Sequence, residues 1–309
     1  MLHFEELTWP ELEALDRVHT VVFVVLSPLE EHGPHLPLGT DLYTGRGIAE
    51  AIALRLEQHY PQVTCVLLPA IPLGSGAIPY LGTIGTPVRL VRQALFQAGK
   101  ALARDGFHCI IAVSGHLGLS HLSAMEAASK AVSRRYGITM VAPVAGIWHR
   151  LLHSKELGAR FSGLNEPIVG QALKLLLRAH HSGSMETSLM LHLHPELVNI
   201  NYQHLKRVDW WHLVRWRGWT RAHWPGYVGD PTLARADVGQ VMVEMMAQLG
   251  ADLAARMVEE QVQARQAAPL TSRNVLRPKV AASLLLIFAG LASGVAGLLF
   301  WKGRRGHPT

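Results

Sequence analysis

Residues 21–41 have the sequence VVFVVLSPLEEHGPHLPLGTD, which joins an apolar, β-branched run to a loop rich in carboxylates and imidazoles. The run 21–26 suits a strand that is covered on both faces of a sheet. Side chains beyond the carboxyl end of such a strand point into the crevice where open α/β sheets bind ligands. Glu30 and His32 are two residues apart, so an extended backbone projects both to the same side. Asp41 follows a turn, where it could cap the next helix and offer its second oxygen to a metal.

The side chains of this loop are of the types that bind transition metals. A lone histidine beside an acid is usually a surface pair or a satisfied core group. This loop instead combines four such side chains: Glu30, His32, His35 and Asp41. Mixed carboxylate and imidazole ligands suit zinc, manganese or iron better than calcium or magnesium. We therefore predict a metal-binding or catalytic role for the loop.

Two further segments place similar side chains where a site is expected. The apolar run 110–113 is followed by Ser-Gly-His116-Leu-Gly, which again puts an imidazole at the carboxyl end of a buried strand. His181 lies in a Ser- and Gly-rich segment, and Glu186 begins a helix-like run that could direct its carboxylate into the crevice. Taken alone, His116 could instead be a capping or core residue, and His181 a solvated loop histidine.

Short apolar runs alternate with segments of helical spacing, which indicates βαβ units and a mostly parallel sheet. The predicted strands are 21–26, 64–68, 110–113 and 138–141. The predicted helices are 42–60, 89–104, 123–136, 165–181 and 234–266. Ser123 and Glu126 form a plausible capping box for the third of these helices.

The basic charge of the chain is concentrated at its C-terminal end. The sequence has 29 Lys and Arg residues against 23 Asp and Glu residues. Six of the basic residues and none of the acidic ones lie beyond residue 270, so the rest of the chain is neutral. A nucleic-acid footprint needs basic residues on the folded domain, which argues against nucleic acid as a partner. Cys65 and Cys109 lie in apolar runs, which predicts buried free thiols and favours a reducing compartment.

Residues 280–301 contain no charged side chain and are long enough to cross the hydrocarbon core of a bilayer as a helix. Their glycines are tolerated in membrane helices, and a buried core helix is the alternative. We expect a domain over 1–266, a linker over 267–279, a transmembrane helix over 280–301 and a short basic tail over 302–309. The first residues lack the features of a signal peptide. The expected arrangement is therefore a single-pass C-terminal anchor with the catalytic domain in the cytoplasm.

Three motifs together resemble those of the creatininase family of metal-dependent amidohydrolases, over roughly residues 7–249. The family pattern Glu-x-His-Gly-Pro-His-Leu-Pro, followed by an Asp, matches residues 30–37 and Asp41. Its Gly-His after a central strand matches residues 115–116, and its His-x-Gly-x-x-Glu-Thr-Ser matches residues 181–188.

The resemblance implies a three-layer α/β/α fold with a mostly parallel central sheet. It also implies two divalent metal ions (Zn, Mn or Fe) as cofactors. The implied ligands are Glu30, Asp41 and His116 for one ion, and His32, the bridging Asp41 and Glu186 for the second. His181 and Glu186 are the implied catalytic residues, with His181 as proton donor to the leaving nitrogen.

The implied reaction is hydrolysis of a cyclic or linear C–N amide bond in a small-molecule substrate by a metal-activated water. Relatives assemble into hexamers, which implies a homo-oligomer. The chain departs from the family at Ser114 and Leu119, where many relatives have Asn, and at Gly118, where creatinine-cleaving members have a metal-binding Glu. A peptide-processing member of the same family and a non-catalytic, membrane-tethered scaffold are the alternatives. The Trp-rich segment 210–224 could contact a membrane, another subunit or the mouth of the active site.

Overall fold

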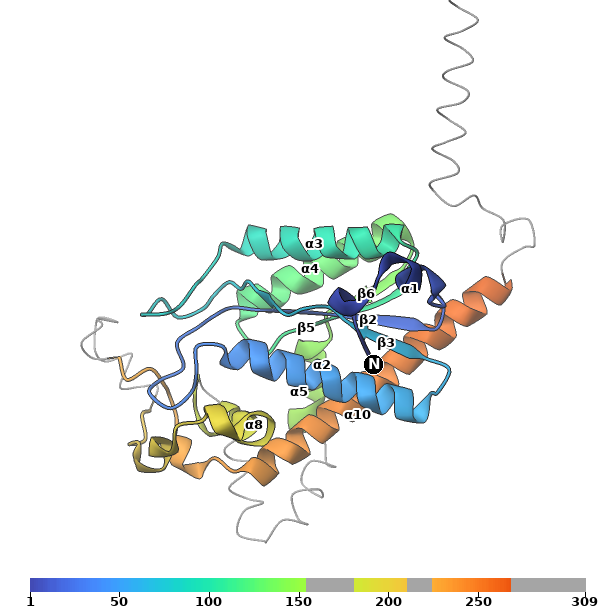
Figure 1. Ribbon diagram of the computed structural model, residues 1–309. Coiled ribbons are helices and arrows are strands. Elements are labelled where there is room, and N and C mark those ends of the chain that lie inside the picture. The colour runs from blue at the N-terminus through green and yellow to red at the C-terminus, as the bar shows by residue number, and fades with distance from the viewer. Residues whose placement is uncertain (154–180, 210–223, 268–309) are drawn as a thin grey trace, which may run out of the picture. The chain divides into compact units, whose positions relative to one another are not determined.

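The computed structural model describes residues 1–153, 181–209 and 224–267, and a parallel β-sheet lies at its centre (Figure 1). Within these residues six strands form the sheet, in the order β1-β3-β2-β5-β6, with β4 pairing to β2. The paired strands all run parallel. The strands are β1 (Leu2–His3), β2 (Thr20–Ser27), β3 (Thr64–Leu67), β4 (Ile71–Pro72), β5 (Cys109–Val113) and β6 (Thr139–Val141).

Helices alternate with these strands along the chain. The α-helices are α1 (Trp9–Ala14), α2 (Thr40–His59), α3 (Val88–Arg104), α4 (Leu119–Tyr136), α5 (Val144–His153), α8 (Ser184–Leu193) and α10 (Ala236–Ala267). Short 3-10 helices are η1 (Phe4–Glu6), η2 (Pro195–Leu197), η3 (Ile200–His204) and η4 (Pro231–Leu233). The alternation of predicted elements is confirmed, and the four predicted strands form within one residue of their expected ends.

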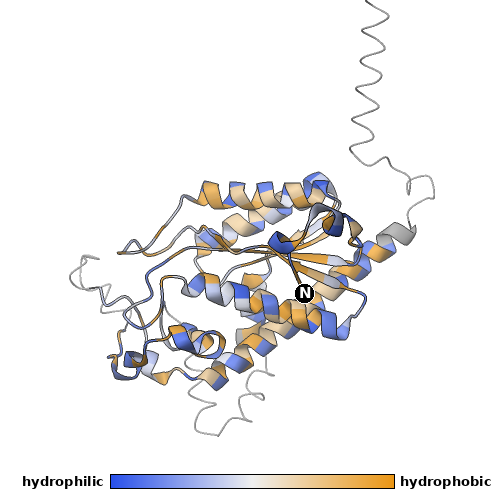
Figure 2. Cartoon of the chain, in the orientation of Figure 1, coloured by the Kyte–Doolittle hydropathy of each residue, from blue (hydrophilic) through white to orange (hydrophobic). Residues whose placement is uncertain are grey.

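The central strand β2 is buried along its whole length, because helices cover both faces of the sheet. Helices α3 and α4 cover one face, where Val22, Val24 and Leu26 pack into a common apolar core with both helices. Helices α2, α5 and α10 lie on the other face (Figure 1). The strands are mostly hydrophobic, whereas the helices carry both hydrophobic and hydrophilic residues (Figure 2). The fold is therefore a three-layer α/β/α arrangement with a mostly parallel sheet.

Helix α2 begins earlier than the sequence predicts, and this changes the role of Asp41. Its N-cap is Gly39, which makes no side-chain capping bond, so the prediction that Asp41 caps the helix is wrong. The Thr40 hydroxyl donates to the Pro37 carbonyl at 2.7 Å and begins the helix before Asp41. A carboxylate in the first helical turn is favoured by the positive end of the helix dipole.

Helix α4 also begins earlier than predicted, at Leu119. The Leu122 amide donates to the Gly118 carbonyl at 3.0 Å, so the first turn forms directly after the His116 loop. The predicted capping box of Ser123 and Glu126 is therefore wrong, because both residues lie inside the helix. The predicted end is confirmed: Gly137 caps the helix in the left-handed conformation.

Several predictions fall on residues outside the described ranges. These are most of the predicted helix 165–181, the Trp-rich segment up to residue 223, nearly all of the linker, and the transmembrane segment 280–301. Among the described residues, no helix is both long and apolar enough to cross a membrane. Cys65 and Cys109 are buried, as predicted, and neither forms a disulfide among the described residues.

The loop after β5 lies directly against the first turns of α2. A Cβ added at Gly115 would lie 2.3 Å from the Asp41 carbonyl oxygen and 2.9 Å from the Gly45 amide nitrogen. A Cβ added at Gly45 would in turn lie 2.8 Å from the Gly115 nitrogen. Because both positions are glycine, the two backbones can touch, and this contact brings the loops after β2 and β5 together.

We expect Gly115→Ala to lower the free energy of unfolding by about 1–3 kcal/mol, because the added methyl group fits only if α2 moves away from the β5 loop. Urea unfolding of the full chain, followed by circular dichroism, measures this change. Gly146→Ala is the matched control, since among the described residues no atom outside the neighbouring backbone of α5 lies within 4 Å of its Cβ position. The control should raise stability by up to about 1 kcal/mol through helix propensity. Equal stability of Gly115→Ala and the wild type would contradict the close packing.

Candidate metal centre

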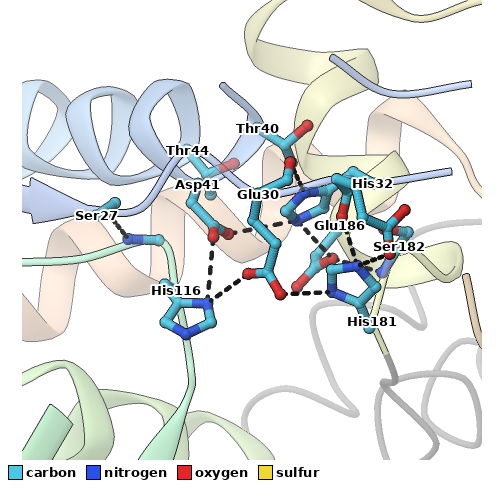
Figure 3. A network of polar contacts seen from close by, with 12 residues as sticks. Ser27, Glu30, His32, Thr40, Asp41, Thr44, His116, His181, Ser182 and Glu186 are labelled. Atoms are coloured by element: carbon cyan, nitrogen blue, oxygen red, sulfur yellow. Dashed lines mark hydrogen bonds and ion pairs between the residues drawn. The ribbon is translucent and has the colours of Figure 1, made fainter. Parts of the chain in front are cut away.

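Three segments that are far apart in the sequence meet at the carboxyl edge of the sheet (Figure 3). They supply the predicted site residues, in chain order Glu30, His32, Asp41, His116, His181 and Glu186. The first segment is the loop after β2 with the first turn of α2, and the second is the loop after β5. The third is the turn before α8 with the first turn of that helix. The structure therefore brings together all six predicted side chains.

One group of donors consists of Glu30, Asp41 and His116. The Nδ1 atom of His116 lies 3.1 Å from Glu30 Oε2 and 3.2 Å from Asp41 Oδ2. One ligand atom from each residue lies within 4.8 Å of the other two. All three side chains are buried, and their spacing allows them to hold one metal ion.

The second group consists of His32, Asp41 and Glu186. The Nε2 atom of His32 lies 3.4 Å from Asp41 Oδ1 and 3.5 Å from Glu186 Oε2. Asp41 therefore directs one carboxylate oxygen towards each group and lies between them (Figure 3). This geometry allows two cations to share the Asp41 carboxylate.

The donor atoms of both groups fit divalent cations. Glu30 Oε2, His32 Nε2 and Asp41 Oδ2 are buried, and apart from the ion-pair contacts above they have no hydrogen-bond partner among the described residues. Buried polar atoms in proteins nearly always have a partner, and a divalent cation is one partner that suits both the carboxylate oxygens and the deprotonated imidazole nitrogen. Three carboxylates and two imidazoles form a donor set that suits zinc or manganese.

Residues 5–254 match the Creatininase family, which is described as creatinine amidohydrolase. The chain belongs to the creatininase family. A solved creatinine amidohydrolase (creatininase) is 19% identical, covers 82% of this chain and 97% of its own, and has a TM-score of 0.60. A mutant creatininase of Zn-Zn type is 18% identical, and the match covers 81% of this chain and 96% of that one, with a TM-score of 0.60. A creatininase with Mn is 20% identical, and the match covers 82% of this chain and 96% of that one, with a TM-score of 0.55. At these identities the likeness shows the creatininase fold.

A curated relative of this chain is described as a peptidase. The mycofactocin precursor peptide peptidase of Mycobacterium ulcerans (strain Agy99) is 28% identical to this creatininase-family chain over 195 residues. The match covers 62% of this chain and 61% of the relative. The chain thus spans about three fifths of the length of that protein.

The carboxylates of this creatininase-family centre stabilise the protonated forms of the two histidines beside them. Desolvation lowers the pKa of His32, but the charges of Asp41 and Glu186 outweigh it and raise the pKa to about 10. Desolvation of His116 is likewise outweighed by Asp41 and Glu30, which raise its pKa to about 10. Burial opposes ionisation of Asp41, yet the two imidazoles hold the pKa of that carboxyl well below its usual range. The site is therefore built to bind protons or metal cations among fixed negative charges.

Backbone groups orient the donors of the second group. The Nδ1 atom of His32 lies 3.0 Å from the Glu30 carbonyl, which accepts only, so Nδ1 carries the hydrogen and Nε2 is the free donor atom. The Ser182 amide donates to Glu186 Oε2 at 2.7 Å. Ser182 has a φ of 54°, a conformation that costs free energy for a non-glycine residue. This strained turn places its amide on the Glu186 carboxylate.

Two buried serines, which the sequence analysis did not select, hold the His116 loop. The Ser114 hydroxyl accepts from the His116 amide at 3.0 Å, and Ser27 Oγ accepts from the Gly115 amide at 3.1 Å. The two hydroxyl oxygens lie 3.1 Å apart. These contacts tie the end of β5 to the end of β2. Their position directly after two buried strands is the signal that could have identified them.

His181 lies beside the centre and belongs to neither of the two groups of donors described above. Its Nδ1 atom lies 3.9 Å from Glu30 Oε1, and its ring centroid lies 4.5 Å from that of His32. These three residues form a third group with metal-ligand spacing. The Glu31 carbonyl accepts a hydrogen bond from His181 Nε2 at 2.7 Å. This bond places the hydrogen on Nε2 and leaves Nδ1 facing the centre.

The sequence analysis missed Glu31, which contacts His181 from the same loop. Its carboxylate lies 3.5 Å from His181 Nε2 and accepts a hydrogen bond from the Trp224 indole. Burial opposes ionisation of Glu31, but the bonds from His181 and Trp224 outweigh it and lower its pKa. The alternation of an extended segment directs Glu31 away from Glu30 and His32, so that pattern alone does not select it.

His35 was grouped with the metal-binding side chains, but the structure places it against α8 instead. Its Nε2 atom lies 3.0 Å from Thr187 Oγ1, and the Thr187 hydroxyl donates to the Gly183 carbonyl at 2.8 Å. Burial lowers the pKa of His35 to about 4, so its imidazole is neutral at pH 7. A further buried histidine, His121, bonds the Leu26 carbonyl at 3.1 Å, and burial lowers its pKa to about 4. Both imidazoles stabilise the loops around the centre.

We expect metal binding to release about two protons per chain near pH 7. His32 and His116 have pKa values raised to about 10, so both are protonated below that pH and must lose the proton to act as ligands. The apparent metal affinity should therefore fall as the pH falls. Titration calorimetry of the chelator-treated full chain with Zn²⁺, in two buffers of different ionisation enthalpy, counts the protons. Equal heats in the two buffers would contradict this prediction.

Proposed function

We propose that this protein is a metal-dependent hydrolase that cleaves the C–N bond of a linear peptide at a dinuclear centre. The observation that carries the proposal is the position of Asp41 between two groups of buried donors. The first ion would be held by Glu30, Asp41 and His116. The second would be held by His32, Asp41 and Glu186. Zinc, manganese and iron are the metals that this donor set favours.

Bound divalent cations would supply Lewis acidity and would lower the pKa of water towards neutrality. The protein shields the donor side chains from bulk water, because Glu30, His32 and Asp41 are each no more than 2% exposed. In such surroundings, fixed charges act on a polarised amide more strongly than they would in water. The Ile78 amide donates to Glu30 Oε1 at 2.6 Å and fixes the orientation of that carboxylate.

His181 would carry the proton to the leaving nitrogen. Its Nδ1 atom has no hydrogen while Nε2–H bonds the Glu31 carbonyl, so Nδ1 would first accept a proton from the attacking water and then pass it on. Its Nε2–H bond to the Glu31 carbonyl leaves Nδ1 on the side of Glu30, where the scissile bond would lie. An amine leaves an amide only after its nitrogen has been protonated, so a donor at this point is required. The ring is only partly exposed, with 14% of its side chain open to solvent.

Two observations favour a linear peptide over a creatinine-like cyclic amide as substrate. The curated relative is a peptide peptidase, and its identity to this chain exceeds that of the creatininase structures described above. Gly118 stands where creatinine-cleaving members have a metal-binding Glu. A Cβ at Gly118 would lie 2.3 Å from His116 Nε2, so the imidazole occupies the space that a side chain there would need.

Metal analysis of the reconstituted full chain tests the dinuclear centre. We expect about two ions per chain in the wild type, none in Asp41→Asn, and about one in Glu186→Gln, because only Asp41 contacts both groups. Inductively coupled plasma mass spectrometry measures the content after removal of free metal. Glu126→Gln is the matched control, since Glu126 is an exposed residue paired with Lys130. Retention of two ions by Asp41→Asn would exclude the shared carboxylate.

A substrate screen tests the reaction. The Zn- or Mn-loaded full chain in detergent should release new amino groups from a library of linear peptides and should leave creatinine unchanged. A chelator or the Asp41→Asn substitution should lower the rate by at least about 10³-fold, because the water is then no longer activated. Cleavage of creatinine alone would overturn the assignment of substrate. Failure to cleave any amide would favour the tethered scaffold.

A further inference from the structure

The imidazole of His181 is held at one edge by Glu31. The Glu31 carbonyl accepts from Nε2 at 2.7 Å, and the Glu31 carboxylate oxygen Oε1 lies 3.5 Å from the same nitrogen. The backbone carbonyl of His181 accepts from the Val228 amide at 2.8 Å. Both the ring and the backbone of His181 are therefore fixed by segments outside its own turn.

Two aromatic rings contact the faces or edges of the same imidazole. The His32 ring lies at a centroid distance of 4.5 Å and a tilt of 45°. The Trp224 ring lies at 6.3 Å and is nearly parallel to it, with an interplanar angle of 25°. Trp224 donates its indole hydrogen to the Glu31 carboxylate, so this ring is itself held by Glu31.

Glu31 makes these contacts although it belongs to none of the groups with metal-ligand spacing among the described residues. It is 5% exposed, and carboxylates are rarely buried to this extent unless they are paired, as Glu31 is with His181. Its second oxygen accepts from the Gly33 amide at 3.2 Å, and its own amide donates to Thr83 Oγ1 at 3.0 Å. The side chain is thus fully engaged, and its contacts converge on Trp224 and His181.

We propose that Glu31 and Trp224 form a clamp that positions His181 for proton transfer to the leaving nitrogen. The inference rests on the proposed function, since it assigns these two positioning residues to the hydrolytic site. The Glu31 backbone carbonyl keeps the hydrogen on Nε2. The Glu31 carboxylate and the Trp224 ring form the side-chain clamp that holds Nδ1 towards Glu30. Loss of either half lets the imidazole turn away from the scissile bond, and a displacement of about 1 Å costs on the order of 100-fold in rate.

The kinetic test compares two leaving groups on one acyl group. The substrates are the best peptide of the screen and the p-nitrophenyl ester of its acyl half, because the phenolate leaves without a proton. We expect Glu31→Ala and Trp224→Ala each to lower kcat for the peptide by about 10- to 100-fold, with KM changed less than about threefold. The rate with the ester should fall less than about threefold. Glu31→Gln keeps an acceptor for the indole and should lose less than Glu31→Ala.

Controls separate the clamp from the metal centre and from general stability. The double variant should lose no more than the worse single variant, because both residues act through one imidazole. The metal content should stay at the wild-type value in all variants. Trp9→Ala is the matched tryptophan control, since Trp9 is 75% exposed on α1. Equal losses with peptide and ester, or a loss of metal, would overturn the clamp.

A measurement without substrate keeps the inference separate from the proposed function. Diethyl pyrocarbonate labelling of the Zn-loaded full chain, followed by peptide mapping, reports the access to His181. We expect both alanine variants to raise its labelling rate several-fold, with no change in Trp9→Ala. An unchanged rate would overturn the clamp even in a protein that cleaves nothing. Raised labelling in a protein without hydrolytic activity would support the clamp and count against the proposed function.

Discussion

The organisation of this protein depends on three carboxylates, two buried and one partly buried, that lie together at one edge of a parallel sheet. Glu30 and Asp41 are almost fully buried, and Glu186 joins them from α8. Such negative charge is costly to desolvate unless positive charge lies beside it. His32 and His116 supply part of that charge, and the orphaned donor atoms call for more. The fold therefore gathers several negative groups that favour a cation, and this preference does not depend on any one of them.

Backbone packing makes this concentration of charge possible. Asp41 contributes to both donor groups only because α2 begins beside the β5 loop, where Gly115 and Gly45 let the backbones touch. Ser27 and Ser114 then connect the ends of the two strands that carry Glu30 and His116. Strands β2 and β5 are hydrogen-bonded neighbours, so their carboxyl ends must lie side by side. The site is thus a consequence of strand order and glycine placement as much as of ligand identity.

Much of this could be predicted from the sequence, because the relevant signals are local. The apolar runs predicted the strands, and polar residues directly after them predicted Glu30, His32 and His116 at one edge. Helix starts were predicted less well. Glycine has no side chain that could mark Gly39 as the N-cap of α2. The sequence analysis therefore assigned the N-cap to Asp41, which lies inside the first turn of the helix. The convergence of α8 on this edge followed from the family resemblance, since no local pattern links residues so distant in the chain.

Glu31 shows why the rest could not be predicted in the same way. In an extended segment the residue between two ligands points to the opposite side, and the usual inference is that it faces solvent or the core. Here its side is occupied by Trp224 and His181, which arrive from segments about 150 to 190 residues away. A carboxylate in that position gains its partners only from tertiary contacts, which no spacing rule encodes. The alternation that separates Glu31 from the candidate metal ligands therefore also allows one short loop to contact both the candidate metal centre and the proposed proton donor.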